Sequence, residues 1–274
     1  MIWIDFNAFA PDSRGNRLAD YRVQTVRDSS RERLYLRGPK EVDQQMAWVL
    51  TREHRNPKHL PLREQDGSDW THRIEFDGPL SAEARSTLSV LQSALTLSRR
   101  EELRIALALD FHMVPTDGVD PQLWPHTEAG SLLNRAKYRG SAEALTELGT
   151  RLSGIATRHA LYTLADVVLS VPGHDSSQVS FGERLAHAVA SNLSLPLVSA
   201  TCSVNRRPQA KSGEATADLE SLFSVDPSVQ GQVCLIVDDV YRSGSSMVAV
   251  ARAAQRSSAR ACIGIAATRT LRAS

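Results

Sequence analysis

The chain has 274 residues, of which 42% are hydrophobic, and its formal net charge is +1. A chain of this length can bury a sizeable core and is long enough for two domains. Because its charge is nearly balanced, no global field directs it to nucleic acid or to a membrane surface, although local patches remain open. No apolar stretch approaches the roughly 20 residues of a membrane span, and the N-terminus lacks the layout of a signal peptide. We therefore expect a cytoplasmic protein without membrane contact.

The three cysteines are Cys202, Cys234 and Cys262, all in the last third of the chain. Their spacing does not match a metal site. Two of them stand inside apolar runs, which is typical of buried free thiols in a reducing compartment.

Residues 1–115 are interpreted as a small α+β module of unknown role. Strands are predicted at residues 1–9, 21–26, 33–36 and 71–76. Helical spacing at residues 39–50 predicts a helix, and the charged, proline-containing stretch 52–69 predicts an exposed loop.

Ser81 is a candidate N-cap for a helix that carries Leu88, Leu91 and Leu95 and extends toward Glu102. An apolar strand follows at residues 105–111.

Asp110 and His112 stand at the end of that strand, where residues two apart share a face. They are interpreted either as a metal or acid–base pair or as structural residues. The proline- and aspartate-rich stretch 114–125 predicts a boundary loop, which divides the chain into residues 1–115 and 116–274.

The second part alternates helical and strand patterns. Helices are predicted from residue 131 to 155 and at 180–193, and strands at 166–171, 195–198, 233–237 and 261–267. A basic cluster at 135–140 interrupts the first helical region. On a solvent-exposed helix face such a cluster would not indicate a function. Alternating elements of this kind predict an α/β fold with a parallel sheet flanked by helices.

The stretch 233–246 carries the strongest functional pattern. Its apolar run 233–237 shows no alternation, which predicts a strand buried on both faces. A helical spacing of apolar residues follows at Met247, Val250, Ala251 and Ala254. The loop between them is therefore expected at the carboxyl end of a central strand, where α/β sheets bind ligands.

That loop, residues 243–246, offers backbone N–H groups and three hydroxyls at a helix N-terminus, and its glycine lets a ligand approach closely. This pattern predicts a phosphate pocket. The preceding Asp238 and Asp239 would repel phosphate, but they can accept hydrogen bonds from sugar hydroxyls or hold water around Mg²⁺. A phosphate site beside a diol site fits a ribose 5-phosphate. The alternative is an ordinary buried strand capped by the aspartates, with Ser245 as an N-cap.

Residues 235–246 read Leu-Ile-Val-Asp-Asp-Val-Tyr-Arg-Ser-Gly-Ser-Ser. This run resembles the phosphoribosyl-pyrophosphate (PRPP) binding motif of type I phosphoribosyltransferases. In that motif four apolar and two acidic residues precede four variable positions ending in Thr or Ser, then Gly, any residue, and Thr or Ser. The resemblance implies that Asp238 and Asp239 bind the ribose hydroxyls at the catalytic centre, while residues 242–246 wrap the 5-phosphate.

The resemblance also points to groups that contact pyrophosphate. Residues 172–177 correspond to the family's pyrophosphate loop, with Gly173 and His174 as contacts, although an exposed loop histidine is the alternative. The polar stretch 206–211 would close over the reaction centre, with Lys211 near the leaving group; a solvated loop is the alternative here. Mg²⁺ is the implied cofactor, held through the substrate and by the aspartates. The predicted substrate-binding residues are Tyr241, Arg242, Ser243, Gly244, Ser245, Ser246, Gly173, His174 and Lys211.

Within this family the C-terminal half most resembles the ComF-type competence-associated, amidophosphoribosyltransferase-like proteins. The likeness is carried by the runs at 133–140, 170–172, 181–186, 207–209 and 218–223, besides the PRPP motif.

Three departures from the family pattern stand out. Residues 179–182, Val-Ser-Phe-Gly, replace the usual Arg-Gly-Phe-Asn of that branch, and Asp218 stands where the branch has asparagine and a neighbouring arginine. Arg242 occupies the place where purine-specific members carry a carboxylate, which argues against hypoxanthine–guanine chemistry.

The function implied is Mg²⁺-dependent transfer of ribose 5-phosphate from PRPP to an unidentified nitrogen acceptor, with release of pyrophosphate. The alternative, favoured by the missing arginines and the unfamiliar N-terminal module, is a non-catalytic sensor of PRPP or a ribose 5-phosphate-containing nucleotide, linked to DNA uptake or defence. A homo-oligomer remains open. So does nucleic-acid binding by the module, with a solvated basic face as its alternative. The arginines concerned are Arg14, Arg17, Arg22, Arg27, Arg31 and Arg33.

Overall fold

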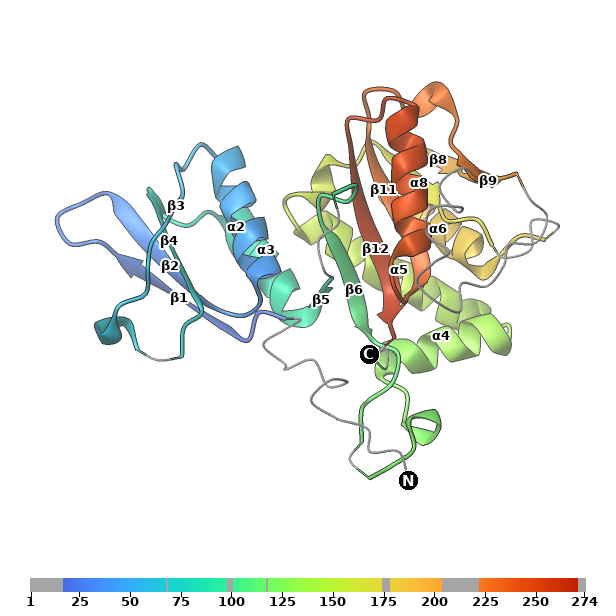
Figure 1. Ribbon diagram of the computed structural model, residues 1–274, viewed down its shortest axis with the longest axis horizontal. Coiled ribbons are helices and arrows are strands. Elements are labelled where there is room, and N and C mark those ends of the chain that lie inside the picture. Colours follow the sequence, from blue (N-terminus) through green and yellow to red (C-terminus); the bar gives the residue numbers. More distant parts are fainter. Residues whose placement is uncertain are drawn as a thin grey trace.

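The computed structural model describes residues 17–67, 69–97, 101–116, 118–173, 178–203 and 222–270. The described chain forms two bodies side by side, a smaller one built from the N-terminal elements and a larger one around a central sheet (Figure 1). The strand predicted at residues 1–9 lies outside the described residues.

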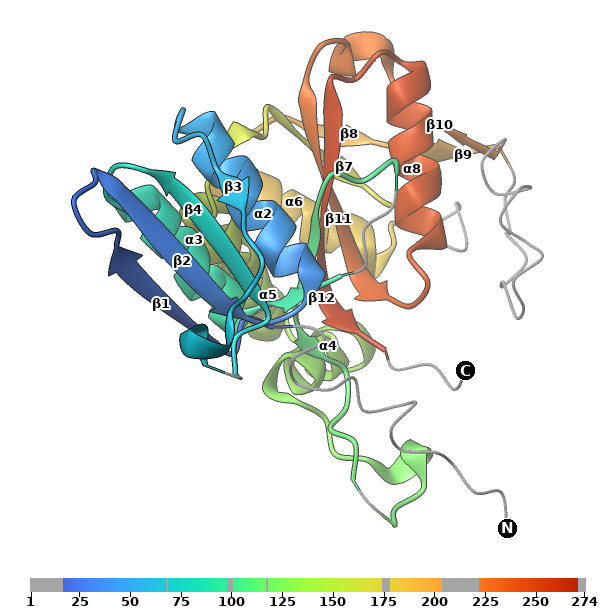
Figure 2. The same cartoon turned by 60° about the vertical axis from the view of Figure 1, so that its left-hand side comes forward.

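The N-terminal module contains a four-stranded antiparallel sheet in the order β1-β2-β4-β3. Its elements are β1 (Asp20–Thr25), β2 (Arg31–Arg37), α2 (Lys40–Arg52), β3 (Lys58–His59), η2 (Glu64–Asp66), β4 (His72–Asp77) and α3 (Ala82–Ser93). Figure 2 shows both helices on one face of this sheet. The predicted strands at 21–26, 33–36 and 71–76 and the predicted helix at 39–50 are confirmed to within a few residues.

Alternation along the strands produces the module's core. The pairing of Leu34 with Ile74 places both side chains on the face that α2 and α3 cover, and both are fully buried. The helical stripe of α2 meets them through the buried Val42, Met46 and Val49.

Two expectations for the module are wrong. The stretch 52–69 is only partly an exposed loop, because Asp66 is buried and accepts a 2.7 Å hydrogen bond from Arg73. The helix capped by Ser81 ends at Ser93, well short of Glu102. Leu95 belongs to a strand, since the backbone becomes extended at residue 94 and the next two residues pair with β6.

The larger body is a six-stranded sheet in the order β5-β6-β12-β11-β7-β8. Five strands are parallel and β5 runs antiparallel at one edge. The elements are β5 (Leu95–Thr96), β6 (Ala106–Phe111), η3 (Pro121–Leu123), α4 (Glu128–Tyr138), α5 (Ala142–Arg158), η4 (Tyr162–Leu164), β7 (Val167–Ser170), α6 (Phe181–Leu193), β8 (Leu197–Ser199), β9 (Thr201–Cys202), β10 (Phe223–Ser224), η6 (Pro227–Val229), β11 (Val233–Tyr241), α8 (Ser245–Arg256) and β12 (Ala261–Arg269).

Helices cover both faces of this sheet, as the unbroken apolar run in β11 predicts. Leu235 and Val237 point to the side covered by α4, α5 and α6, whereas Cys234 and Ile236 point to the side covered by α8. All residues of the predicted run 233–237 are buried. The predicted α/β class, a parallel sheet flanked by helices with an N-terminal α+β module, is therefore confirmed, and Cys234 and Cys262 are buried free thiols.

The two bodies are joined by hydrogen bonds as well as by the chain. Gln45 of α2 bonds to His159 at 2.9 Å, and Thr87 of α3 accepts from the amide of Ala160 at 3.0 Å. Because β5 and β6 already belong to the larger sheet, sheet membership changes between α3 and β5, before the boundary predicted at 115/116.

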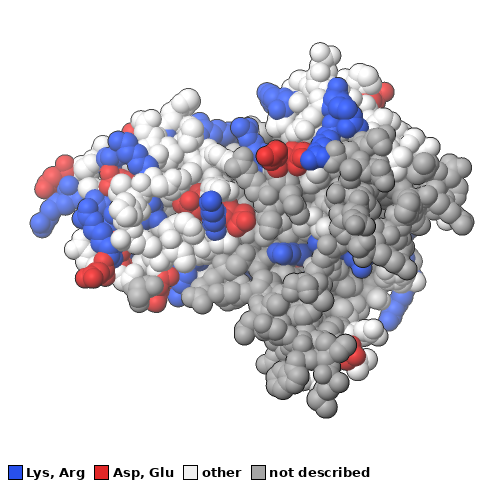
Figure 3. Space-filling view, viewed as in Figure 1, with Lys and Arg blue, Asp and Glu red and all other residues white. Residues whose placement is uncertain are grey.

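Charges on the module are mixed rather than uniformly basic (Figure 3). Of the arginines considered for nucleic-acid contact, Arg14 lies outside the described residues, and several of the others interact with side chains of the protein itself. Three of them form the ion pairs Arg17–Asp110, Arg31–Glu75 and Arg33–Glu75. The guanidinium of Arg22 lies over the ring of Tyr35.

Candidate active site

The acidic pair lies at the carboxyl end of β11, but within the strand rather than after it. The strand continues to Tyr241 because β12 also continues to Arg269, and these two residues pair. Asp238 and Asp239 are partly buried there, and the amide of Asp239 donates to Asp238 Oδ1 at 2.8 Å. The carboxyl edge of a central strand thus carries the two carboxylates, where ligand sites of such sheets lie.

The serine-rich loop turns directly into α8. Gly244 is the N-cap residue with φ of 75°, and Ser245 is the first helical residue, so the alternative with Ser245 as N-cap is wrong. A Cβ on Gly244 would lie 2.5 Å from Tyr241 Oη, which means that only glycine fits under this ring. Ser243 Oγ lies 2.8 Å from Ser245 Oγ. The amide of Ser245 donates to Ser243 Oγ at 3.4 Å. The N-terminus of a helix directs its first backbone amides outward, which suits it to bind phosphate.

A cavity of about 600 Å³ joins the acidic pair to this loop. Of the predicted residues it brings together Asp238, Asp239, Arg242, Ser246 and Gly173. Tyr241 is buried and does not line it; its ring instead packs against Gly244. Ser243, Gly244 and Ser245 adjoin the cavity without lining it. His174 and Lys211 lie outside the described residues.

The structure adds residues that sequence reasoning did not assign to the site. These further lining residues follow β6 or β12, or come from α4, β11 and the β7–α6 segment: His112, Leu133, Lys137, Tyr138, Val171, Ser180, Phe181, Gly182, Val240 and Thr270. Pro172 also lines the cavity and belongs to the predicted pyrophosphate loop 172–177. The hydroxyl oxygen of Thr270 is buried and has no hydrogen-bond partner among the described residues. A buried hydroxyl of this kind needs a partner, which a ligand in the cavity can supply.

Lys137 of α4 is the main addition. Its Nζ lies 2.6 Å from Asp239 Oδ2, with the lysine side chain 32% and the aspartate side chain 16% exposed. Burial by itself would lower the pKa of Lys137, but the charge and hydrogen bond of Asp239 outweigh it, so the pKa of Lys137 lies above its usual value. The only sequence signal was the basic cluster at 135–140, which gave no reason to select this lysine.

Asp238 keeps a proton on its carboxyl group at neutral pH. Burial, followed by the negative charge of Asp239, raises the pKa of Asp238 to about 8, against the opposing influence of Lys137. Lys137, Asp239 and a protonated Asp238 therefore sum to nearly zero charge at neutral pH. A site without excess negative charge tolerates the approach of a phosphorylated ligand better than two bare carboxylates would.

Among the described residues no group of three or more histidine, cysteine or acidic side chains could hold a metal ion. Two carboxylates in a cavity nevertheless suit Mg²⁺, which keeps several waters and takes further oxygens from a phosphorylated substrate. In the same described ranges, none of the helices combines the length and apolar character that crossing a bilayer requires.

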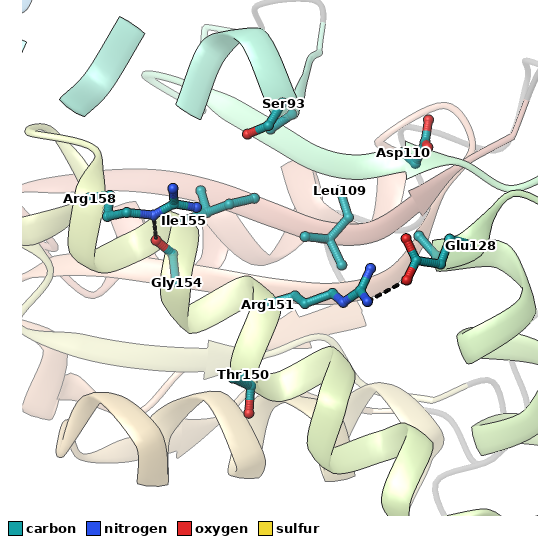
Figure 4. Close-up of a pocket in the computed structure, with 11 residues that line it drawn as sticks. Ser93, Leu109, Asp110, Glu128, Thr150, Arg151, Gly154, Ile155 and Arg158 are labelled. Carbon is teal, nitrogen blue, oxygen red and sulfur yellow. Dashed lines mark hydrogen bonds and ion pairs between the residues drawn. The ribbon is translucent and has the colours of Figure 1, made fainter. Parts of the chain in front are cut away.

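Asp110 and His112, which the sequence leaves open as a functional pair or as structural residues, line two different cavities. Asp110 accepts a 2.6 Å hydrogen bond from Arg17, and it lines a second cavity of about 420 Å³ between α3, α4 and α5 (Figure 4). His112 instead lines the cavity of the acidic pair. In the second cavity Arg151 is already paired with Glu128, and none of the residues predicted for the site lies there.

Comparison with protein families gives a match for the C-terminal third of the chain. The family model described as a phosphoribosyl transferase domain matches residues 180–271. No curated protein sequence matches the chain.

Three solved structures show partial similarity. Adenine phosphoribosyltransferase from Leishmania tarentolae is 11% identical, with a TM-score of 0.38 over 62% of this chain and 79% of that one. Orotate phosphoribosyltransferase from Aeropyrum pernix is 19% identical, with a TM-score of 0.30 over 47% and 59%. Phosphoribosylpyrophosphate synthetase from Mycobacterium smegmatis is 23% identical, with a TM-score of 0.30 over 44% and 33%. The chain thus spans about a third of the synthetase and three fifths of the orotate enzyme. The stretch that matches this family model, from α6 to the end of β12, contains Asp238, Asp239 and the loop that begins α8.

Proposed function

We propose that this protein binds PRPP and transfers its ribose 5-phosphate to a nitrogen acceptor, with release of pyrophosphate. The observation that carries the proposal is the arrangement at the end of β11, where two carboxylates and the N-terminus of α8 meet in one cavity. The phosphoribosyl transferase domain match over residues 180–271 supports it.

The two parts of the site suit the two ends of the sugar. The N-terminus of α8, preceded by Gly244, presents backbone amides to the 5-phosphate. Asp238 and Asp239 accept hydrogen bonds from the ribose hydroxyls. Arg242 lines the same cavity and is exposed, so it can add a cationic contact to a phosphate group.

The reaction requires positioning more than covalent chemistry. The bond between C1 of the ribose and the pyrophosphate oxygen breaks, its electron pair leaves with pyrophosphate, and the acceptor nitrogen forms the new bond to C1. Positive charge develops on the sugar during this exchange, and the negative charge of Asp239 beside the ring stabilises it. When bound, Mg²⁺ would neutralise charge on the leaving pyrophosphate, with Asp238 and Asp239 as the oxygen donors of the protein.

A non-catalytic sensor of PRPP or a nucleotide is the second candidate. It is favoured by the ion pair between Lys137 and Asp239, because this pair already engages one of the two acidic side chains within the protein. A sensor and an enzyme share the binding step and differ in whether pyrophosphate is released.

The test is pyrophosphate release from PRPP and Mg²⁺ in the presence of a panel of bases and amines. We expect release by the wild type and a loss of roughly 10- to 100-fold in Asp239→Asn, because a hydrogen bond to a charged group contributes about 1.5–3 kcal/mol. Asp226→Asn is the matched control, since Asp226 caps the distant η6 and does not line the cavity. Saturable PRPP binding without release would identify a sensor, and absence of binding would refute both candidates.

A further inference from the structure

His112 lines the acidic-pair cavity, and hydrogen bonds hold its backbone on two sides. It follows β6 directly, its amide donates to Arg269 O at 2.8 Å, and its carbonyl accepts from the amide of Thr127 at 3.3 Å. Gly130 of α4 packs so closely that a Cβ there would lie 1.9 Å from His112 O. These contacts involve only the backbone of His112, so they fix its position between β12 and α4 independently of the side chain.

The imidazole ring is oriented by its neighbours. Nδ1 lies 3.4 Å from Thr268 Oγ1, and the ring of His126 meets it edge-on with centroids 4.9 Å apart. Within the described part of the chain, no hydrogen bond engages Nε2, which leaves this nitrogen for a ligand in the cavity that His112 lines.

Charges around the ring favour its neutral form. Burial lowers the pKa of His112 below its usual value, His126 and Lys137 lower it further, and Asp239 only partly opposes them. Arg269 on β12 adds a guanidinium beside the same strand end, while Asp110 on the histidine's own strand is already paired with Arg17. At neutral pH the imidazole therefore keeps a lone pair.

We infer that His112 accepts the proton that the nitrogen acceptor loses as it attacks C1 of the ribose. The inference rests on the proposed phosphoribosyl transfer. In the balanced step, the N–C1 bond forms, the C1–O bond breaks with its electron pair leaving on pyrophosphate, and the proton of the acceptor N–H passes to His112 Nε2. The acceptor is then a neutral group that carries an N–H, such as a ring N–H or an amine.

The other titratable groups that line the cavity are less suited to this role. Lys137 is protonated and paired with Asp239. The two aspartates lie at the end of β11 and are assigned to the sugar, and Tyr138 is 70% exposed. The guanidinium of Arg242 donates hydrogen bonds but cannot accept a proton. His112 is the remaining base, and its carbonyl is pinned by α4, the helix that also carries Lys137.

The test compares His112→Gln with His187→Gln. His187 is an exposed imidazole on α6 that does not line the cavity, so its variant is a matched control. Pyrophosphate release from PRPP and Mg²⁺ is measured as kcat/KM against pH, with whichever base or amine of the panel supports turnover. PRPP affinity is measured separately by calorimetry.

We expect His112→Gln to lower kcat/KM by about 10²- to 10⁴-fold, the range for a general base, while the PRPP dissociation constant changes less than about threefold. The wild type should lose activity toward acid as His112 takes up a proton, and the variant should lose this limb. His112→Ala should regain activity when free imidazole is added, which a folding defect would not allow.

Retained activity and an unchanged acid limb in His112→Gln would overturn the role of His112 while leaving phosphoribosyl transfer intact. PRPP binding without release for any acceptor would overturn the role of His112 together with transfer. Absence of PRPP binding by the wild type would refute the proposed function itself, so the two failures are distinguishable.

Discussion

Three charged residues from two elements share the end of β11. Asp238 and Asp239 are neighbours in sequence, whereas Lys137 comes from α4, 102 residues before Asp239. Their proximity couples the protonation of the site to the free energy of unfolding, because burial and mutual repulsion keep a proton on Asp238 that the unfolded chain releases.

Replacing Asp238 by asparagine tests this coupling. The folded pKa of about 8 lies above the ordinary value, so the folded state binds more protons than the unfolded state between about pH 4 and pH 8. The free energy of unfolding of the wild type therefore falls as pH rises through this window, by at most about 1.4 kcal/mol per pH unit.

In Asp238→Asn that contribution is absent. Urea unfolding should show a gain in stability relative to the wild type that is larger at about pH 8 than at about pH 5. A constant difference between the two pH values would contradict the elevated pKa of Asp238.

At this scale the sequence was sufficient for the acidic pair but not for its surroundings. Asp238 and Asp239 are adjacent and follow a recognisable strand, so a local pattern reveals them. The partner of Asp239 depends on how α4 packs against the sheet edge, which no local pattern encodes. His112 was noticed beside Asp110, yet the choice between its two interpretations needed the cavity.

At the scale of elements, the turn between β11 and α8 depends on one glycine. Gly244 combines a positive φ with the ring of Tyr241 where a Cβ would lie. Gly231 shares a similar φ of 72° but has open space around it. Alanine substitutions at the two glycines therefore separate the energetic cost of the left-handed backbone conformation from the cost of a steric clash with Tyr241.

Gly231→Ala should lose about 1–2 kcal/mol of stability, the cost of a left-handed conformation for a residue with a Cβ. Gly244→Ala should lose more, because the turn must shift to relieve the contact with Tyr241. It should also weaken PRPP binding, which Gly231→Ala should leave unchanged. Equal melting temperatures and equal PRPP affinities for the two variants, measured by calorimetry, would contradict the packing described for the turn.

Element boundaries show where local signals fail. The apolar run of β11 was predicted, but its extension to Tyr241 depends on continued pairing with β12. The helix capped by Ser81 was predicted to continue because Leu95 fits its spacing; instead Leu95 pairs with Ala108 of β6. Pairing with a neighbouring strand therefore sets the C-terminal end of β11 and the C-terminal end of α3, and a local sequence pattern does not contain this information.

At the scale of the whole molecule, a buried histidine lies where the module meets the larger sheet. His159 is fully buried; its Nδ1 accepts from the amide of Leu161 at 3.2 Å, so Nε2 carries the proton and donates to Gln45 of α2. Burial lowers the pKa of His159 to about 3. The unfolded chain therefore binds a proton here between about pH 6.5 and pH 3 that the folded protein does not.

The free energy of unfolding should consequently fall as pH drops through that window, by up to about 1.4 kcal/mol per pH unit. His159→Gln should flatten this dependence, whereas the exposed control His187→Gln should retain it. Urea unfolding at about pH 7 and about pH 5 measures the slopes. If the free energy of unfolding changed equally with pH in the wild type and in His159→Gln, the buried His159 would not be the source of the loss of stability in acid.

The organisation into two bodies was only partly predictable. A proline-rich stretch suggested a division at 115/116, since composition changes there. The strands β5 and β6 pair with the larger sheet instead, and pairing between distant segments is invisible to composition. The fold of the second part was recoverable because its strands and helices alternate in the order that a parallel sheet requires.

We propose that the end of β11 and the N-terminus of α8 together bind PRPP, and calorimetric titration of the wild-type protein with PRPP and Mg²⁺ is the decisive experiment. We expect saturable heat with a dissociation constant between about 1 μM and 1 mM, the usual range for enzyme substrates, and clear weakening in Asp239→Asn. No saturable heat at millimolar PRPP, or equal binding by wild type and Asp239→Asn, would contradict it.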